Sequence, residues 1–286
     1  MRPKIRTSVL RSVMIHRNIY LTLLYMSFFY ANQPMATTIP EDASQVRMYV
    51  VVTPSHEQLF HKWFRPTLQD KYELVVKRSK QDGAAGNYMG HGWTRATLKK
   101  VNLILEAIKE NWGKPFVFSD VDIQFFRPTW PTLAALLKDY DMLTQLVRPQ
   151  QTSSCTGFFV CVGNERTLEA WQAARSWMLS RPSENKNDDQ YAFNAVMLEN
   201  PTKLKLGLLP DIFMPGYIWR KQKRLPEGIL LHHANFAIGI DSKIKQLKEV
   251  RRKFAQIVPR ANIPPSAVEP FDVTRCNLKA LASKCS

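Results

Sequence analysis

Two aspartates stand at the end of a short apolar run, where their spacing suits metal chemistry. In the segment FVFSDVDIQFF, Phe116, Val117 and Phe118 precede Asp120 and Asp122. Residues two apart in an extended segment point to the same side, so both carboxylates can face one way. They repel each other unless a cation joins them. Carboxylate oxygens suit Mn²⁺ or Mg²⁺, which also bind diphosphate oxygens and neutralise charge on a departing diphosphate.

Two other interpretations of this segment stay open. The carboxylates can simply cap the end of a strand. Alternatively, a haloacid-dehalogenase-like phosphatase also places Asp-x-Asp after an apolar strand. That family has Thr or Val four residues after its first Asp, where this chain has Gln124. Its motif also usually opens the domain, whereas Asp120 lies well inside the chain, so the phosphatase is the second-ranked hypothesis.

The pattern around the two aspartates predicts an α/β domain. Strands are expected at 47–53, 72–77 and 116–118, and helices at about 56–69 and 94–112. In the longer helix, apolar residues spaced by 3 and 4 would form one buried stripe: Leu98, Val101, Leu105, Ile108 and Trp112. Strands that alternate with helices indicate a mixed, mostly parallel, Rossmann-like sheet flanked by helices, whose ligands bind at the carboxyl ends of the strands.

The rest of the chain continues this alternation within a single domain, expected over about 45–265. A strand at 157–162 is followed by helices at 165–179, from Asp188 or Asp189 onward, and at 242–257. Asn164 is placed to cap the first of these helices, because Asn is a favoured N-cap residue.

The four cysteines indicate no metal centre of their own. Cys155 and Cys161 flank one strand, which separates them by roughly 20 Å, so they cannot bridge each other. Cys276 and Cys285 lie in the tail, residues 266–286, close enough in sequence to close a small loop in an oxidising lumen. No CxxC or Cys/His spacing indicates zinc.

A basic and then apolar N-terminus, with a polar stem, occupies residues 1–44. Residues 1–17 carry five basic residues and no acidic one, and the apolar run 19–31 follows. As a helix this run would rise only about 20 Å, short of the ~30 Å hydrocarbon core. A signal peptide, a short signal-anchor and an amphipathic or buried helix all fit it, and the lack of an A-x-A site favours the anchor. An anchor would give a single-pass type II protein of the Golgi or ER membrane whose domain faces the lumen.

The formal net charge of +16 raises the alternative of a nucleic-acid-binding protein. Residues 1–17 contribute +5 of this charge, and over 203–253 twelve basic and four acidic residues give +8 (12 − 4). A basic face there would suit a phosphorylated ligand, a nucleic acid or an anionic surface. No helix-turn-helix, RNP or zinc-finger pattern accompanies it, so we expect no nucleic-acid partner.

Five segments, in order over 116–248, resemble the nucleotide-diphospho-sugar transferases, a family with the GT-A fold. The segments are FVFSDVDIQFFRP, SSCTGFFVCVGNERTLEAW, NDDQYAFNAVM, LLPDIFMPG and LLHHANFAIGIDSKIKQL. The family often has Asn before its Thr-Gly or Ser-Gly pair, where this chain has Cys155, a departure on the acceptor side of the site. The resemblance implies a metal-dependent glycosyltransferase with a nucleotide-sugar donor.

The resemblance also implies the metal ligands. Asp122 would ligate Mn²⁺ or Mg²⁺, and Asp120 would touch the metal shell or the donor ribose. His233 would be the third ligand, with a structural histidine as the alternative. Because adjacent residues of a strand point oppositely, only one of His232 and His233 should reach the metal, and we choose His233.

Further positions would hold the donor or lie beside the reacting sugar. Lys100 and Gly157 would contact the donor, and Lys243, near the start of the last helix, would hold a β-phosphate together with the helix N-terminus. A solvated lysine is the alternative for Lys243. The resemblance places Asp189 and Gln190 near the reacting sugar as catalytic candidates, although an aspartate here can also be a simple N-cap.

The implied reaction is retaining, so the product would keep the anomeric configuration of the donor. It would run either through a covalent sugar on Asp189 or by front-side attack assisted by the leaving phosphate. We favour the second route, because no nucleophile stands out and positioning and electrostatics would then supply the catalysis. A UDP-sugar is the expected donor, and a glycan or glycoprotein is the expected acceptor. A pseudoenzyme with the same fold is the remaining alternative.

Overall fold

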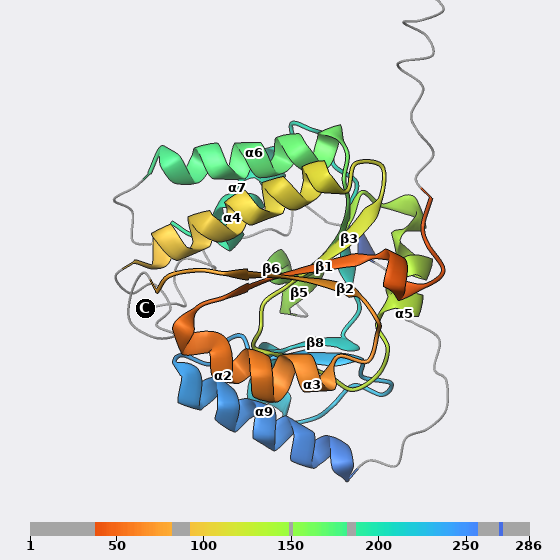
Figure 1. Ribbon diagram of the computed structural model, residues 1–286, viewed down its shortest axis with the longest axis vertical. Coiled ribbons are helices and arrows are strands. Elements are labelled where there is room, and N and C mark those ends of the chain that lie inside the picture. Colours follow the sequence, from red (N-terminus) through yellow and green to blue (C-terminus); the bar gives the residue numbers. More distant parts are fainter. Residues whose placement is uncertain (1–37, 82–91, 149–150, 182–186, 257–268, 271–286) are drawn as a thin grey trace, which may run out of the picture. The chain divides into compact units, whose positions relative to one another are not determined.

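The computed structural model describes residues 38–81, 92–148, 151–181, 187–256 and 269–270 (Figure 1). The expected N-terminal anchor and the cysteine pair of the tail lie outside these residues. Among the described helices, none combines the length and the hydrophobicity needed to cross a membrane.

One large sheet forms the centre of the described chain. Its seven strands lie in the order β10-β7-β5-β6-β3-β1-β2. β1 pairs in parallel with β2 and β3, and β5 pairs in parallel with β7, whereas β6 is antiparallel to both β3 and β5. The sheet is therefore mixed with most strands in one direction, as predicted. The strands are β1 Arg47–Val52, β2 Glu73–Arg78, β3 Pro115–Ser119, β5 Met142–Arg148, β6 Gln151–Val162, β7 Leu206–Leu209 and β10 Glu269–Pro270.

A second, smaller sheet joins the two segments that carry the candidate metal ligands. β4 (Ile123–Phe125) follows Asp122 directly, and β9 (Leu231–His233) ends at the expected ligand. These strands pair antiparallel with Ile123 opposite His233, and β8 (Phe213–Pro215) pairs in parallel with β9. This register brings the end of β9 to the carboxyl end of β3, although the two lie far apart in the sequence.

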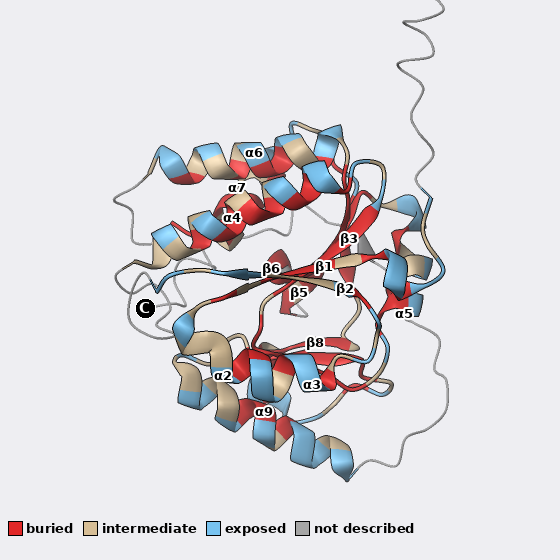
Figure 2. Cartoon of the chain, in the orientation of Figure 1, coloured by how far each residue is buried: buried red, intermediate tan, exposed pale blue. Residues whose placement is uncertain are grey.

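Helices cover both faces of the large sheet, and their sheet-facing sides are the buried ones (Figures 1 and 2). On one face α4 (Trp93–Glu110), α6 (Glu165–Leu179) and α7 (Asp189–Glu199) pack around an apolar core. The small sheet, α9 (Ile240–Ala255) and short helices pack around a second core on the other face. The short helices are η1 Ala43–Gln45, η2 Pro54–His56, α2 Glu57–Leu59, η3 Phe60–Phe64, α3 Arg65–Thr67, α5 Trp130–Leu136, η4 Leu137–Asp139 and α8 Gly216–Gln222.

The prediction that five apolar residues of α4 form one buried stripe is wrong at one position. Trp112 is 47% exposed, because the helix ends at Glu110 and the chain turns before the tryptophan. Asn111 makes this turn: its side-chain amide donates to the Ala107 carbonyl at 2.7 Å. Gly113 follows with φ +73°, a left-handed conformation that suits glycine.

The helix starts that depend on capping agree with prediction. Asn164 accepts the Thr167 N–H at 2.9 Å, and Thr167 Oγ1 accepts the Asn164 N–H at 3.0 Å, a reciprocal capping box. Asp188 is the N-cap of α7. Cys155 and Cys161 are both buried and unbridged, as their positions in one strand predicted.

Candidate active site

Asp120, Asp122 and His233 form a compact cluster at the carboxyl end of β3. Each residue offers one ligand atom, and these atoms lie within 4.8 Å of one another. His233 Nε2 is 3.2 Å from Asp122 Oδ1 and 3.9 Å from Asp120 Oδ2. Carboxylate oxygens and an imidazole nitrogen are together a ligand set that suits divalent metals such as Mn²⁺. The structure therefore brings together the three residues that were expected to bind metal.

Backbone hydrogen bonds and one glycine set the geometry of this cluster. Asp120 donates its N–H to the Gly157 carbonyl at 2.6 Å, and Ala234 donates its N–H to the Asp122 carbonyl at 2.9 Å. A Cβ on Gly157 would lie 2.3 Å from His233 Cε1 and 2.6 Å from Asp120 Oδ2. A residue without Cβ is needed there, so that two of the candidate ligands can meet.

The two adjacent histidines point in opposite directions, as strand alternation predicted. His233 directs Nε2 at the aspartates, and its Nδ1 lies 2.8 Å from Gln145 Oε1. His232 turns to the other side, where Gln124 Nε2 is 3.3 Å from its Nδ1 and Gln246 Nε2 is 3.1 Å from its Nε2. Gln145 thus orients the His233 ring in the way that hydrogen-bond partners orient metal-binding histidines.

Two cations hold Asp122 in its ionised form. Lys243, in the first turn of α9, contacts Asp122 Oδ2, while His233 lies at the other carboxylate oxygen. Burial acts to raise the pKa of Asp122, but Lys243 and His233 outweigh burial and hold that pKa well below its usual range. Burial likewise acts to lower the pKa of His233, but the Asp122 carboxylate outweighs it and raises that pKa to about 10.

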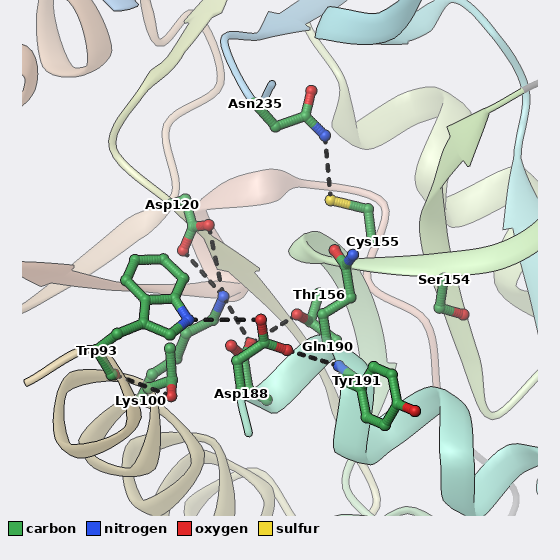
Figure 3. A network of polar contacts seen from close by, with 12 residues as sticks. Trp93, Lys100, Asp120, Ser154, Cys155, Thr156, Asp188, Gln190, Tyr191 and Asn235 are labelled. Carbon is green, nitrogen blue, oxygen red and sulfur yellow. Dashed lines mark hydrogen bonds and ion pairs between the residues drawn. The ribbon is translucent and has the colours of Figure 1, made fainter. Parts of the chain in front are cut away.

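Lys100 links the cluster to α7 (Figure 3). Its Nζ lies 3.1 Å from Asp120 Oδ1 and 2.9 Å from Asp189 Oδ2. Burial acts to lower the pKa of Lys100, but the two carboxylates outweigh burial and raise that pKa above its ordinary value. Thr156 donates its hydroxyl to the same Asp189 oxygen at 2.6 Å. Asp189 is therefore buried and holds Lys100 beside Asp120.

The neighbours of Asp189 on α7 differ in role. Asp188 caps the helix by accepting a backbone N–H of its first turn, and Trp93 Nε1 donates to Asp188 Oδ2 at 3.4 Å. Burial, and then the charge of Asp189, raise the pKa of Asp188 to about 6. In Figure 3 the Gln190 amide extends from α7 toward Cys155.

Two residues at the site were not predicted. His56, directly after β1, lies close enough to Asp122 and Lys243 to respond to their charges, and burial lowers its pKa. Because β1 and β3 are parallel, their carboxyl ends meet at one edge of the sheet, so the place of His56 after the first strand was a usable signal. Gln145 has no such signal, because nothing in its local sequence marks it.

Comparison with known families shows to which family the chain belongs. The sequence model described as nucleotide-diphospho-sugar transferase matches residues 46–247. The chain belongs to this family. It is a glycosyltransferase, and the expected GT-A-like α/β fold is confirmed. This family match replaces the phosphatase and nucleic-acid-binding hypotheses. Gln124, the residue at which the chain departs from the phosphatase motif, lies in β4 and donates to the Leu247 carbonyl at 3.0 Å.

Two solved structures are similar to this transferase at low identity. A glycosyltransferase involved in the glycosylation of the major capsid of PBCV-1 shares 11% identity, with a TM-score of 0.46 over 72% of this chain and 98% of that chain. The glycosyltransferase GlyE in Streptococcus pneumoniae TIGR4 shares 12% identity, with a TM-score of 0.41 over 76% of this chain and 66% of that chain. No curated protein matches the chain. The assignment rests on the family match.

Removal of Lys100 should destabilise the transferase strongly. Lys100→Met leaves Asp120 and Asp189 without their shared cation, and breaking a buried ion pair in this way costs about 3 kcal/mol or more. The deficit should shrink as the pH falls, because Asp120, whose pKa burial raises, then takes up a proton. Urea unfolding of Lys100→Met at pH 8 and pH 5 measures it, with Lys109→Met, an exposed lysine of the same helix, as control. Equal losses in the two variants would contradict the ion-pair role.

Asp188→Asn should stabilise the transferase at high pH. The folded-state pKa of Asp188, about 6, lies above the unfolded value of about 3.9, so its contribution to stability is present below about pH 4 and is lost as the pH rises through 6. Asparagine caps a helix as well as aspartate does and carries no charge. Thermal unfolding should show a gain of about 1–2 kcal/mol at pH 8 and little gain at pH 4. A gain that does not depend on pH would rule out this account.

Proposed function

We propose that this transferase moves a sugar from a UDP-sugar onto a glycan or glycoprotein, in a reaction that needs Mn²⁺ or Mg²⁺ and retains the anomeric configuration. The observation that carries this proposal is the Asp120–Asp122–His233 cluster, flanked by Lys100 and Lys243 at the carboxyl edge of the sheet. Two carboxylates, a histidine and two lysines together suit one metal and one diphosphate.

The chemistry and spacing of the three proposed ligands fit such a metal. Neighbouring ligands of an octahedral ion at ~2.1 Å stand about 3 Å apart, and the His233–Asp122 distance is 3.2 Å. Asp120, at 3.9 Å from His233, needs a shift of less than an ångström to reach the same spacing. When bound, the metal would neutralise the charge that develops on the departing nucleoside diphosphate.

The lysines are proposed to hold the donor. Lys243 lies at the N-terminal turn of α9, so its charge and the helix dipole both favour a β-phosphate there. The ammonium group of Lys100 is held by Asp189 beside Asp120, and it has three N–H groups, so it can also donate to a bound donor. His56 and the end of β1 are proposed to border the nucleotide, because they meet Asp122 and Lys243 at the same edge of the sheet.

The environment of Asp189 supports transfer without a covalent sugar. A nucleophilic carboxylate must be accessible to the anomeric carbon. Asp189 is 4% exposed, and one of its oxygens accepts from both Lys100 and Thr156. We therefore propose that Asp189 positions Lys100, and that Gln190, whose amide extends from the helix, lies nearer to the reacting sugar.

A location in the secretory pathway is part of the proposal. The basic N-terminus followed by an apolar run supports a membrane-anchored protein of the Golgi or ER whose domain faces the lumen. Glycans and glycoproteins would be the accessible acceptors there. Fractionation of cells that express the tagged full-length protein, with protease protection of the tag, tests this location.

Nucleotide release from a panel of UDP- and GDP-sugars tests the activity. With Mn²⁺ the full-length protein should release nucleotide from one UDP-sugar, and EDTA should lower the rate at least about 100-fold, since metal charge stabilisation is worth several kcal/mol. Added Mn²⁺ should restore the rate. NMR of the glycoside product reads the anomeric configuration directly. Release that EDTA leaves unchanged would contradict the metal-dependent mechanism, and an inverted product would contradict retention.

A further inference from the structure

Arg148 and two aromatic rings form a cluster that the proposed donor site does not use. The Arg148 guanidinium carbon lies 5.4 Å from the centroids of both the Tyr217 and the Phe236 rings. The two rings contact each other edge-on, with centroids 5.7 Å apart. Arg148 ends β5, Tyr217 lies in α8, and Phe236 follows β9. Three separate elements therefore bring one cation and two rings together.

The cation of this cluster is largely buried, and one of its N–H groups lacks a hydrogen-bond partner within the described part of the chain. Arg148 is 8% exposed, and its buried Nε is unsatisfied. A buried guanidinium N–H that has lost water without gaining an acceptor is unfavourable. A bound anion would satisfy it, and an oxyanion that accepts two N–H groups at once would do so best.

Phe236 is held in a backbone conformation that bulky residues avoid. Its φ is +64°, whereas two other non-glycine residues with positive φ, Asn200 and Lys223, terminate helices. Arg220 Nη1 donates to the Phe236 carbonyl at 2.5 Å and so fixes this turn. Left-handed conformations of bulky residues cost free energy and concentrate at ligand sites. Here the strained turn aims the Phe236 ring at Arg148.

The cluster lies beside the proposed metal ligands, on the side away from β1. Phe236 is three residues beyond His233, at most about 10 Å of chain. Gln145, three residues before Arg148 on β5, contacts His233 directly. In the sheet, β5 lies beyond β6 from β3 and β1. If the nucleotide occupies the β1 side, the cluster borders the side that remains for the acceptor.

We infer that Arg148, Tyr217 and Phe236 form an acceptor subsite for an anionic sugar. The guanidinium would bind a carboxylate or sulfate group, and the rings would pack against the apolar face of the sugar. Arg220 on α8 adds a positive charge next to this cluster, because its guanidinium donates to the Phe236 carbonyl. This inference rests on the proposed function, because it assigns the acceptor chemistry of the same site.

Binding of matched sugars tests this subsite. Methyl β-glucuronide and methyl β-glucoside differ only at C6, where a carboxylate replaces the hydroxymethyl group. Glucose 6-sulfate is compared with glucose to test a sulfate in the same way. With full-length protein, Mn²⁺ and UDP, ligand-observed NMR titrations should show the anionic member of at least one pair bound at least about tenfold more tightly, as charge-assisted hydrogen bonds predict. Arg148→Gln should remove this preference, and Arg148→Lys should keep part of it. Lys221→Gln, an exposed cation on α8, should leave it unchanged.

Other results would overturn the inference. Equal affinity of wild-type protein for both members of both pairs would do so, as would equal weakening of charged and neutral sugars by Arg148→Gln. If Arg148→Gln does not fold, Phe236→Asn serves instead, because Asn tolerates positive φ and replaces the ring with a small amide. This substitution should weaken the binding of every sugar tested, and unchanged affinities would count against the subsite. The affinity for UDP in the presence of Mn²⁺ is measured separately. A wild-type protein that binds no UDP would refute the proposed function, but it would not refute the preference for anionic sugars.

Discussion

Asp122→Asn is expected to lower kcat/KM for sugar transfer at least about a thousandfold, the upper range for loss of one electrostatic group at a reacting centre. Asp122 is the one candidate ligand that contacts both His233 and Lys243. The amide keeps the shape of the side chain but removes the charge that would bind the metal. Isothermal titration with Mn²⁺ and UDP should lose its signal together with the activity.

A matched control separates this effect from a general loss of stability. Asp141 is also buried, and it pairs with Arg166 at the far end of β5 from the site, where Asp141 Oδ1 is 2.5 Å from Arg166 Nη2. Asp141→Asn should lower the unfolding temperature but leave the Mn²⁺ dependence of the remaining activity unchanged. Full activity in Asp122→Asn, or equal loss of metal dependence in both variants, would contradict the assigned role of Asp122.

Gly157→Ala is expected to be the second most damaging change. The new methyl group would stand 2.3 Å from His233 Cε1 and 2.6 Å from Asp120 Oδ2, both inside van der Waals contact. Gly157 cannot retreat, because its carbonyl accepts the Asp120 N–H within the paired strands β3 and β6. Overpacking of this kind costs about 1–3 kcal/mol of stability, and displacement of two ligands should lower activity at least about 100-fold.

Two measurements check the glycine prediction. The Mn²⁺ affinity of Gly157→Ala should fall at 15 °C, a temperature at which circular dichroism still reports a folded protein. Cys155→Ala, two residues earlier on the same strand, removes volume beside His233 and adds none, so it should keep most of the metal affinity. Normal Mn²⁺ affinity in Gly157→Ala would mean that the proposed ligands do not need a residue without Cβ at this position.

Local sequence determined many of the helices and strands of this protein and the type of chemistry expected at its site. The capping box at Asn164 predicted the start of α6, because it depends only on residues within one turn. The apolar run before Asp120 predicted a buried strand, and strand alternation predicted that only one of His232 and His233 would face the metal site. The resemblance of ordered segments then named the family that the sequence match confirms. Apart from the family resemblance, which needs several segments in order, each signal lies within a few residues of the feature that it predicts.

Tertiary structure alone decided which of these residues meet. Lys100 could be placed on a helix from sequence, but its pairing with both Asp120 and Asp189 depends on how α4, β3 and α7 pack. The same holds for Gln145, which reaches His233 because β5 lies beside β6. Trp112 was expected to be buried and is exposed, since a hydrogen bond from Asn111 ends the helix first.

One physical cause separates the features that local sequence predicted from the contacts that only the tertiary structure decided. Capping, alternation and apolar periodicity act through the backbone over one or two turns, so the sequence carries them directly. Contacts such as Lys100 with Asp189, or Arg148 with Phe236, join residues that are far apart in the sequence. These residues meet only because whole helices and strands pack against each other. The strained φ of Phe236 is of this second kind, because surrounding contacts hold it against the local preference of the residue.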